Sequence, residues 1–246
     1  LKREEIIKQF GDNGIFEYAL NSKGIAEISD DTQMTLFTAT GILIGITRRN
    51  LRGIMGPLEG YIWESYTNWC ELQMGLNPDG EQRFSWLMDV PEMGENRAPG
   101  TTCVHAIMKQ RRGSVANPLN DSKGCGGIMR IAPVALYLNR TGDMNRMQNV
   151  FEVASEVAAL THGHELGWLS SGMAAYIINQ VAYRKVTVEE ATRSAIRFVK
   201  EYYSERQHLE ELISIVERAL SFAKNGSDDA ENIRALGEGW VAEETL

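Results

Sequence analysis

Two adjacent carboxylates with a hydroxyl on each side stand just before an apolar stretch of this 246-residue chain. They belong to Asp30 and Asp31, which lie between Ser29 and Thr32. All four side chains carry hard oxygen donors, the kind that Mg²⁺ and Mn²⁺ prefer. Ser and Asp are equally typical of a helix N-cap and a first helical turn, where the helix dipole favours negative charge. The residues alone leave two interpretations open, a helix cap and one half of a divalent-metal site.

The residues that follow have the period of an α-helix. Recurrence at intervals of three and four predicts a buried face with Leu36, Ala39, Thr40, Leu43, Ile44 and Thr47. Neighbouring helical residues point about 100° apart, so the two carboxylates could serve two ions rather than chelate one. A complete metal site requires further carboxylates from elsewhere in the chain.

A second candidate site lies in residues 117–136, where three glycines occupy four positions. Gly124, Gly126 and Gly127 leave the backbone free of side chains, and backbone N–H groups before a helix can bind an anion such as a phosphate. No Gly-Lys-Ser/Thr follows and no convincing strand precedes, so a P-loop and a dinucleotide-binding turn are excluded. The alternative interpretation is a glycine-rich turn that permits close helix packing.

His162 and His164 form a third group, at a predicted junction between two helices. An H-x-H pair suggests zinc, but no third nitrogen or sulfur ligand has a suitable local spacing. Imidazoles at such a junction can cap carbonyl groups or line a pocket, where a neutral ring contacts a ligand. We expect one of these two roles for the histidines.

The composition restricts the partners and the compartment. A formal net charge of −8 argues against general affinity for nucleic acid or for an anionic membrane surface. The one basic run, residues 109–113, is short and predicts a solvated helix end. Three separate cysteines, Cys70, Cys103 and Cys125, indicate no disulfide framework and favour a reducing cytoplasm. With no leader peptide and no apolar run of bilayer length, we expect a soluble protein.

The rest of the chain predicts mostly helices. Thr187 and Glu190 form a capping box. Residues 86–100, with two prolines and two glycines, predict an irregular surface loop. A turn is expected at Asn77, Pro78 and Gly80, and a last helix is expected to carry Ile233, Leu236 and Trp240 inward. We predict an all-α, multihelical fold of eight or nine helices in a single domain over residues 1–246.

The chain resembles the ADP-ribosylglycohydrolase family, including its branch that acts on dinitrogenase reductase. The resemblance is carried by five segments in the family's order: ISDDTQMTLFTA, RAPGTT, SKGCGGIMRIAPVAL, THGHELGWLSSGMAAYII and ALGEGWVAEETL. It implies an orthogonal all-helical fold with two Mg²⁺ or Mn²⁺ ions. It also implies an enzyme that hydrolyses the bond between the anomeric ribose carbon and a modified side chain.

The resemblance also implies roles for individual residues. Asp30 and Asp31 would be catalytic metal ligands together with Ser29. Gly100 and Thr101 would belong to a phosphate loop. The remaining substrate-binding residues would be the pocket residue His162 and the ADP-ribose cradle of Gly124, Cys125, Gly126, Gly127 and Met129. Cys125 stands where relatives commonly have Asn.

Two family motifs are missing from the sequence, the N-terminal Gly-Asp-Ala-Leu-Gly helix and the C-terminal Asp-x-Asp-Thr that completes the metal site. Residues 227–229 precede GEGW, whereas the family motif follows it, so they predict a helix cap. The chain also opens at Leu1 within a charged helical turn. We therefore expect either a fragment of a longer protein or a member without its metal centre.

The function that these features predict is metal-dependent removal of ADP-ribose from protein side chains, with arginine as the expected acceptor. One alternative is hydrolysis of ADP-ribosyl-serine or O-acetyl-ADP-ribose. Another is a non-catalytic ADP-ribose-binding or structural member, like the family's lens crystallin branch. The expected partner is ADP-ribosylated protein or ADP-ribose, with the oligomeric state left open.

Overall fold

The computed structural model describes residues 3–12, 14–54, 56–76, 83–225 and 230–246. Over these residues the backbone forms 11 α-helices and no β-sheet, only isolated β-bridges. The predicted all-α class is confirmed, with more helices than the eight or nine expected. The predicted turn at Asn77, Pro78 and Gly80 and the predicted cap at residues 227–229 lie outside the described residues.

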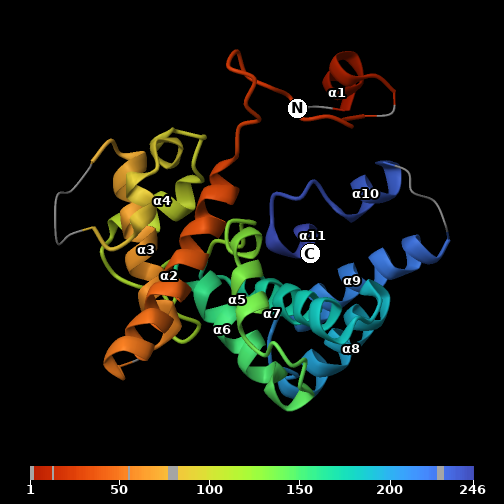
Figure 1. Ribbon diagram of the computed structural model, residues 1–246. Helices are drawn as coiled ribbons and strands as arrows, with labels where there is room; N and C mark the ends of the chain where they lie inside the picture. Colours follow the sequence, from red (N-terminus) through yellow and green to blue (C-terminus); the bar gives the residue numbers. More distant parts are fainter. Residues whose placement is uncertain (1–2, 13, 55, 77–82, 226–229) are drawn as a thin grey trace.

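Helix α2 (Asp30–Arg52) lies alongside α3 (Leu58–Gln73), and α4 (Thr101–Met108) lies next to α3 (Figure 1). The backbones of α2 and α3 touch at Gly41, where an added Cβ would lie 2.7 Å from the Ile62 Cα. Only glycine permits this approach. The helix start that the sequence predicted for α2 is confirmed.

The buried face predicted for α2 is wrong in part: Thr40 is buried as predicted, and Ala39 and Ile44 are half-buried, but Leu36, Leu43 and Thr47 are exposed. Leu36 is 39% exposed and Leu43 is 54% exposed. The side chains that α2 buries are those of Gln33, Met34, Phe37, Thr38, Thr40 and Ile42. The physical reason is Gly41, because the face that carries it lets α3 approach closely and is therefore the face that is covered.

The centre of the core is formed by α5 (Ala132–Tyr137), α6 (Met147–Ala159) and α7 (Glu165–Asn179). The inner face that the sequence predicts for α6 consists entirely of buried residues: Met147, Val150, Phe151, Ala154, Val157 and Ala158. Helices α6 and α7 pack against each other, and the junction between them carries the two histidines of the THGH segment.

Helix α8 (Val188–Tyr202) begins at the predicted capping box, which is confirmed. Thr187 Oγ1 accepts a hydrogen bond from the Glu190 N–H at 3.2 Å, and Glu190 Oε2 accepts one from the Thr187 N–H at 2.8 Å. Helix α9 packs on α7 and α8. The bounds of α9 are Leu209–Lys224. Figure 1 places three short helices above this group, namely α1 (Arg3–Phe10), α10 (Ala230–Leu236) and α11 (Ala242–Thr245).

The segment before α4 is more ordered than predicted. It contains two 3₁₀ helices, η2 (Trp86–Asp89) and η3 (Pro91–Gly94), instead of only an irregular surface loop. Leu87, Met88 and Met93 are buried in this segment. Burial of these apolar side chains explains the added structure.

The inward face predicted for the last helix is wrong for Ile233 and Trp240, whereas Leu236 is half-buried. Helix α10 ends at Leu236, and Ile233 and Trp240 are 68% and 74% exposed. Gly237 and Gly239 follow with φ values of 146° and 75°. Because α-helical residues have negative φ values, the helix cannot continue through these glycines.

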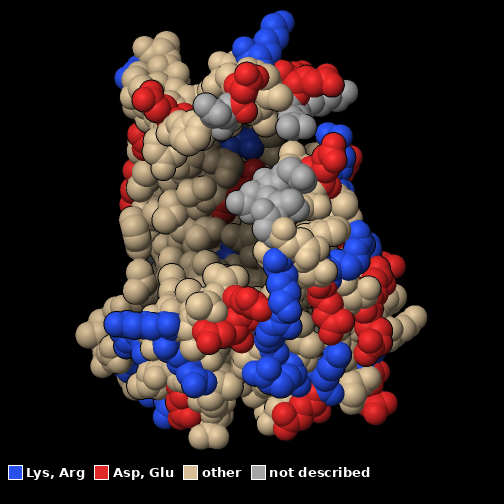
Figure 2. Space-filling view, turned by 90° about the vertical axis from the view of Figure 1, so that its right-hand side faces the viewer, with Lys and Arg blue, Asp and Glu red and all other residues tan. Residues whose placement is uncertain are grey.

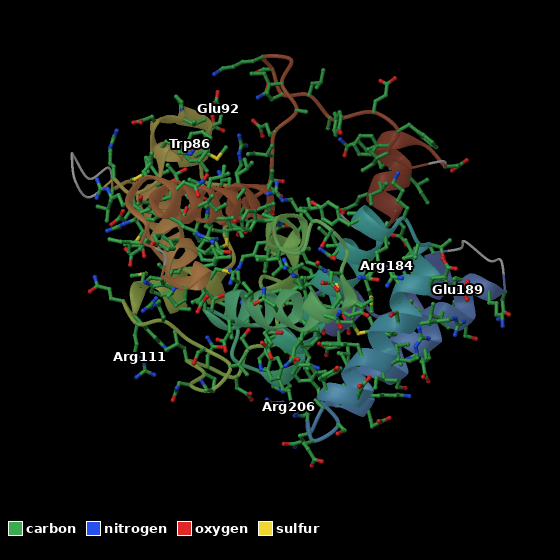
Figure 3. All side chains as sticks on the ribbon, turned by 60° about the horizontal axis from the view of Figure 1, so that its bottom comes forward. Trp86, Glu92, Arg111, Arg184, Glu189 and Arg206 are labelled. Atoms are coloured by element: carbon green, nitrogen blue, oxygen red, sulfur yellow. The ribbon has the colours of Figure 1, made fainter. Side chains whose placement is uncertain are left out.

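Charges of both signs cover the surface. Figure 2 shows basic and acidic side chains intermixed on the lower half of one face, and a hollow in its upper half with both basic and acidic atoms at depth. Arg111 of the basic run and Glu189 of α8 lie on the outside of the molecule in Figure 3. Among the described residues, no helix combines the length and the apolar character that crossing a membrane requires.

Candidate functional site

The N-terminus of α2 carries the acid pair. Ser29 Oγ accepts a hydrogen bond from the Thr32 N–H at 3.4 Å, with the extended backbone of an N-cap residue. Asp30 and Asp31 form the first turn, where the helix dipole favours negative charge. The cap interpretation is therefore confirmed for Ser29. A hydroxyl oxygen has two lone pairs, so a cap can also be a metal ligand.

The two carboxylates are stabilised to different degrees. Asp30 Oδ2 accepts a hydrogen bond from the Gly100 N–H at 3.1 Å. Burial, and then the negative charge of Asp30, raise the pKa of Asp31 above its ordinary value. A cation beside Asp31 would oppose both effects, so the pair has the electrostatics of one half of a cation site.

The loop before α4 is attached to the first turns of α2. Gln33 is buried, and its Nε2 donates a hydrogen bond to the Glu95 carbonyl oxygen at 3.0 Å. The loop ends at Gly100, and α4 begins at Thr101. The phosphate-loop residues that the resemblance implied therefore lie beside Asp30.

The glycine-rich segment also reaches α2. Thr35 Oγ1, in the second turn of α2, lies 2.8 Å from the Asp31 carbonyl oxygen and 3.2 Å from the Met129 carbonyl oxygen, so its single proton is shared between the two acceptors. Burial, and then the negative charge of Asp31, raise the pKa of the Cys125 thiol, which lies within electrostatic reach of the acid pair. The start of α2 therefore brings together the acid pair, residues 100–101 and residues 124–129.

The backbone of the glycine-rich segment is fixed by residues near the end of the chain. The Cys125 N–H donates to the Trp240 carbonyl oxygen at 3.1 Å, and the Ala242 N–H donates to the Lys123 carbonyl oxygen at 2.9 Å. Gly124 and Val241 form an isolated antiparallel bridge. The Cys125 N–H is therefore not available to a bound phosphate.

His162 lies against the glycine-rich segment. His162 is only 2% exposed. An added Cβ on Gly126 would lie 2.7 Å from His162 Cε1, so glycine is required at position 126. Burial, and then the positive charge of Arg130, lower the pKa of His162 to about 3. The structure thus places a neutral imidazole beside the implied ADP-ribose cradle.

His164 is the N-cap of α7. Its Nδ1 accepts a hydrogen bond from the Leu166 N–H at 3.1 Å. The sequence predicted a cap on carbonyl groups or a pocket residue. Because His164 precedes a helix rather than follows one, the group that it caps is an amide.

The acid pair fits Mg²⁺ or Mn²⁺ in the chemistry of its donors but not in their number. Mg²⁺ takes an octahedral set of oxygen ligands, of which Ser29, Asp30 and Asp31 could supply three. No group of three or more His, Cys, Asp or Glu side chains in the described residues could hold a metal ion. The described residues could therefore form one side of a binuclear centre.

Sequence reasoning missed two features of this region. Arg130 is fully buried beneath it, and its signal was a single charge inside the apolar run GGIMRIAPVAL. Lys123 forms an ion pair with the buried Glu243 of α11, which ties the glycine-rich segment to the last helix. The two partners are 120 positions apart, so local patterns give no indication of this pair.

The comparison with known families covers the chain from end to end. The model of the ADP-ribosylglycohydrolase family matches residues 1–246. A search of curated proteins finds no match. The family match includes every segment of the site described above, and it supports a glycohydrolase of ADP-ribosylated substrates in general. This chain belongs to the ADP-ribosylglycohydrolase family.

Proposed function

We propose that this protein removes ADP-ribose from modified arginine side chains with the help of two Mg²⁺ or Mn²⁺ ions. The observation that carries the proposal is the convergence on the start of α2. There the Asp30 carboxylate accepts a hydrogen bond from Gly100, and the Thr35 hydroxyl lies 3.2 Å from the Met129 carbonyl oxygen at the end of the glycine-rich segment. An acid pair next to a glycine-rich backbone suits a substrate that carries both a ribose and a diphosphate.

In this proposal Asp30 and Asp31 hold the ions, and Ser29 offers a further oxygen. When bound, divalent ions supply positive charge that orients the ribose hydroxyls and a water molecule and stabilises the charge that develops as the glycosidic bond breaks. The hydrogen bond from Gly100 fixes the Asp30 carboxylate before substrate binds. Such preorganisation lowers the cost of ordering the site.

ADP-ribose would contact the two loops that flank the acid pair. Gly100 and Thr101 would face its phosphates from the start of α4. The cradle would be formed by Gly124, Cys125, Gly126, Gly127 and Met129, with His162 beneath it. The net charge of −8 and three free cysteines support action in the cytoplasm on a protein or small-molecule conjugate rather than on nucleic acid.

The test is release of ADP-ribose from three substrates, ADP-ribosyl-arginine protein, ADP-ribosyl-serine protein and O-acetyl-ADP-ribose. We expect release from the arginine conjugate with Mn²⁺ or Mg²⁺, and none with a chelator or in Asp31→Asn. Asp143→Asn is a matched control, because Asp143 caps η5 (Met144–Arg146) and Asn caps as well as Asp. If ADP-ribose is released only from one of the other two substrates, arginine is not the acceptor and that substrate takes its place. If no substrate shows metal-dependent release, the proposal is refuted.

A second candidate is a family member that binds ADP-ribose without cleaving it. The observation in its favour is that the described residues place no third His, Cys, Asp or Glu ligand with Asp30 and Asp31. Calorimetry separates the two functions. The second predicts ADP-ribose binding without release, and no tight paired sites for Mg²⁺ or Mn²⁺.

A further inference from the structure

Arg130 is a buried cation with no acidic partner among the described ion pairs. Its guanidinium donates hydrogen bonds to Cys103 Sγ at 3.4 Å, the Val157 carbonyl oxygen at 3.1 Å and Thr161 Oγ1 at 2.7 Å. Its Cζ lies 4.6 Å from the centre of the Tyr66 ring. An apolar side chain could fill this space without the cost of a buried charge, so packing alone does not account for an arginine here.

Thr161 Oγ1 connects Arg130 to His162. It lies 2.7 Å from Arg130 Nη2 and 2.8 Å from His162 Nδ1. A guanidinium can only donate, so Arg130 occupies one lone pair of the hydroxyl oxygen. The hydroxyl proton of the buried Thr161 then needs an acceptor of its own.

Two acceptors lie near this proton, His162 Nδ1 and the thiol of Cys103. Thiol sulfur is a weak acceptor, and the Cys103 sulfur already accepts from Arg130. The proton therefore goes to Nδ1, which must be unprotonated to accept it. A neutral imidazole with an unprotonated Nδ1 carries its proton on Nε2.

The Nε2 atom faces the glycine-rich segment. Added Cβ atoms on Gly124 and Gly126 would lie 3.4 Å and 3.1 Å from it, so the two glycines leave the space next to Nε2 free of side chains. Thr161 is the hydrogen-bond partner of the His162 ring among the described residues, and it bonds to the other nitrogen. Because no described residue accepts a hydrogen bond from Nε2, this nitrogen is free to donate to an oxygen of a bound ligand.

We propose that Arg130 and Thr161 are positioning residues that hold His162 with its proton on Nε2, so that His162 donates a hydrogen bond to an oxygen of ADP-ribose. The identity of the ligand rests on the proposed function, whereas the position of the proton does not. Arg130 acts in two ways. It fixes the direction of the Thr161 hydroxyl, and its charge opposes a second proton on the ring.

The test is a long-range ¹H–¹⁵N spectrum of histidine-labelled protein, which reports which ring nitrogen carries the proton. The chain has four histidines, and His162→Gln assigns the signal of His162. We expect the proton on Nε2 in the wild type and in Thr161→Ser, and a mixture of both forms in Thr161→Val. The Nε2 signal of the wild type should shift when ADP-ribose is added.

Calorimetry with ADP-ribose supplies the second measurement. Loss of one fixed hydrogen bond in Thr161→Val should weaken binding about tenfold, and Thr161→Ser should restore it. Thr192→Val is the matched control, because Thr192 Oγ1 is bonded to the Val188 carbonyl oxygen of its own helix at 2.8 Å. It should change neither the spectrum nor the affinity.

Three results would overturn the proposal. One is a proton on Nδ1 in the wild type, and another is an Nε2 signal that ADP-ribose leaves unchanged in a protein that binds it. The third is Thr161→Val with the wild-type spectrum and affinity. If the wild type binds no ADP-ribose at all, the proposed function fails, and the donor role fails with it, while the spectrum still decides where the proton lies. Should Thr161→Val not fold, the wild-type spectrum and titration still decide where the proton lies and whether Nε2 meets the ligand, and Thr161→Ala takes the place of Thr161→Val in testing the positioning role.

Discussion

The candidate site has two ends, and their charges are compensated in different ways. At the start of α2, Asp30 and Asp31 are half-buried and have a helix dipole and one backbone N–H for support. At the other end, beside Thr161 and His162, Arg130 is fully buried and is supported by neutral groups alone. The acid pair can gain a cation from solvent, whereas Arg130 depends on the groups that bury it, which bond to its two Nη atoms and leave its Nε without a partner.

This difference predicts that mutations at the two ends act on different properties. A charge that the fold must satisfy is part of the folded structure, so its loss reduces stability. A charge that a ligand satisfies contributes little to stability, so its loss reduces function. Four substitutions test this separation.

The largest effect is expected for Arg130→Ala. It leaves a cavity and removes the donor that satisfies Thr161, so the free energy of unfolding should fall by about 3–5 kcal/mol. Urea denaturation measures this change. The matched control is Arg206→Ala, since Arg206 also lies over an aromatic ring, at 5.0 Å from Trp168, but on the surface. Arg206→Ala should lower the free energy of unfolding by about 0.5–1 kcal/mol. Equal losses of stability in Arg130→Ala and Arg206→Ala would contradict the difference between the two ends of the site.

Asp31→Asn should show the opposite behaviour. The rate of ADP-ribose release should fall at least ~100-fold, equal to about 2.7 kcal/mol, because an ion ligand is lost. The free energy of unfolding should stay unchanged or rise slightly, because the variant relieves the repulsion from Asp30. Release assays and urea denaturation on the same preparation make the comparison. A fall in stability that parallels the fall in rate would contradict it.

Local patterns predicted the fold where neighbours along the chain decide the structure. The buried face of α6 and the capping box at Thr187 depend on spacing within one helix, and both are confirmed. The buried face of α2 was predicted only in part, because Gly41 lets α3 approach on a side that the prediction did not include. That choice depends on a partner helix, which the periodicity of α2 does not contain.

The sequence predicted which segments contain the candidate site residues, but not the hydrogen bonds that connect these segments. The motifs locate Asp30, Gly100 and Gly126, and the structure brings their segments together. The path from Arg130 through Thr161 to His162 joins residues about thirty positions apart. A sequence pattern shows neither a side-chain direction nor the nitrogen that carries a proton.

The contributions of His162, which lies at the Arg130 end, and of Asp31 to the free energy of unfolding should change with pH in opposite directions. The pKa of His162 is about 3 in the folded protein, below the ordinary value of 6.5, so below pH 6.5 the unfolded chain binds more protons. This contribution is complete above pH 6.5 and is lost on acidification, by ~2 kcal/mol between pH 6.5 and 5. His162→Gln should remove this slope in urea denaturation at pH 7, 6 and 5.

The pKa of Asp31 is raised, so its contribution has the opposite direction and is lost as the pH rises above its ordinary value of 3.8. Asp31→Asn should therefore leave the acid slope between pH 6.5 and 5 in place. His105→Gln, at an exposed position of α4, serves as the control for replacing a histidine. An acid slope that survives in His162→Gln would contradict the assignment to His162.

The smallest effect is expected for Thr187→Ala, far from either end in the sequence. Loss of the capping box should lower the free energy of unfolding by about 1 kcal/mol. ADP-ribose affinity and the His162 spectrum should not change, because a uniform loss of this size still leaves nearly all molecules folded. Calorimetry and the ¹⁵N spectrum check both. If Thr187→Ala weakened binding as much as Thr161→Val, stability alone would explain both variants, and Thr161 would have no separate role in positioning His162.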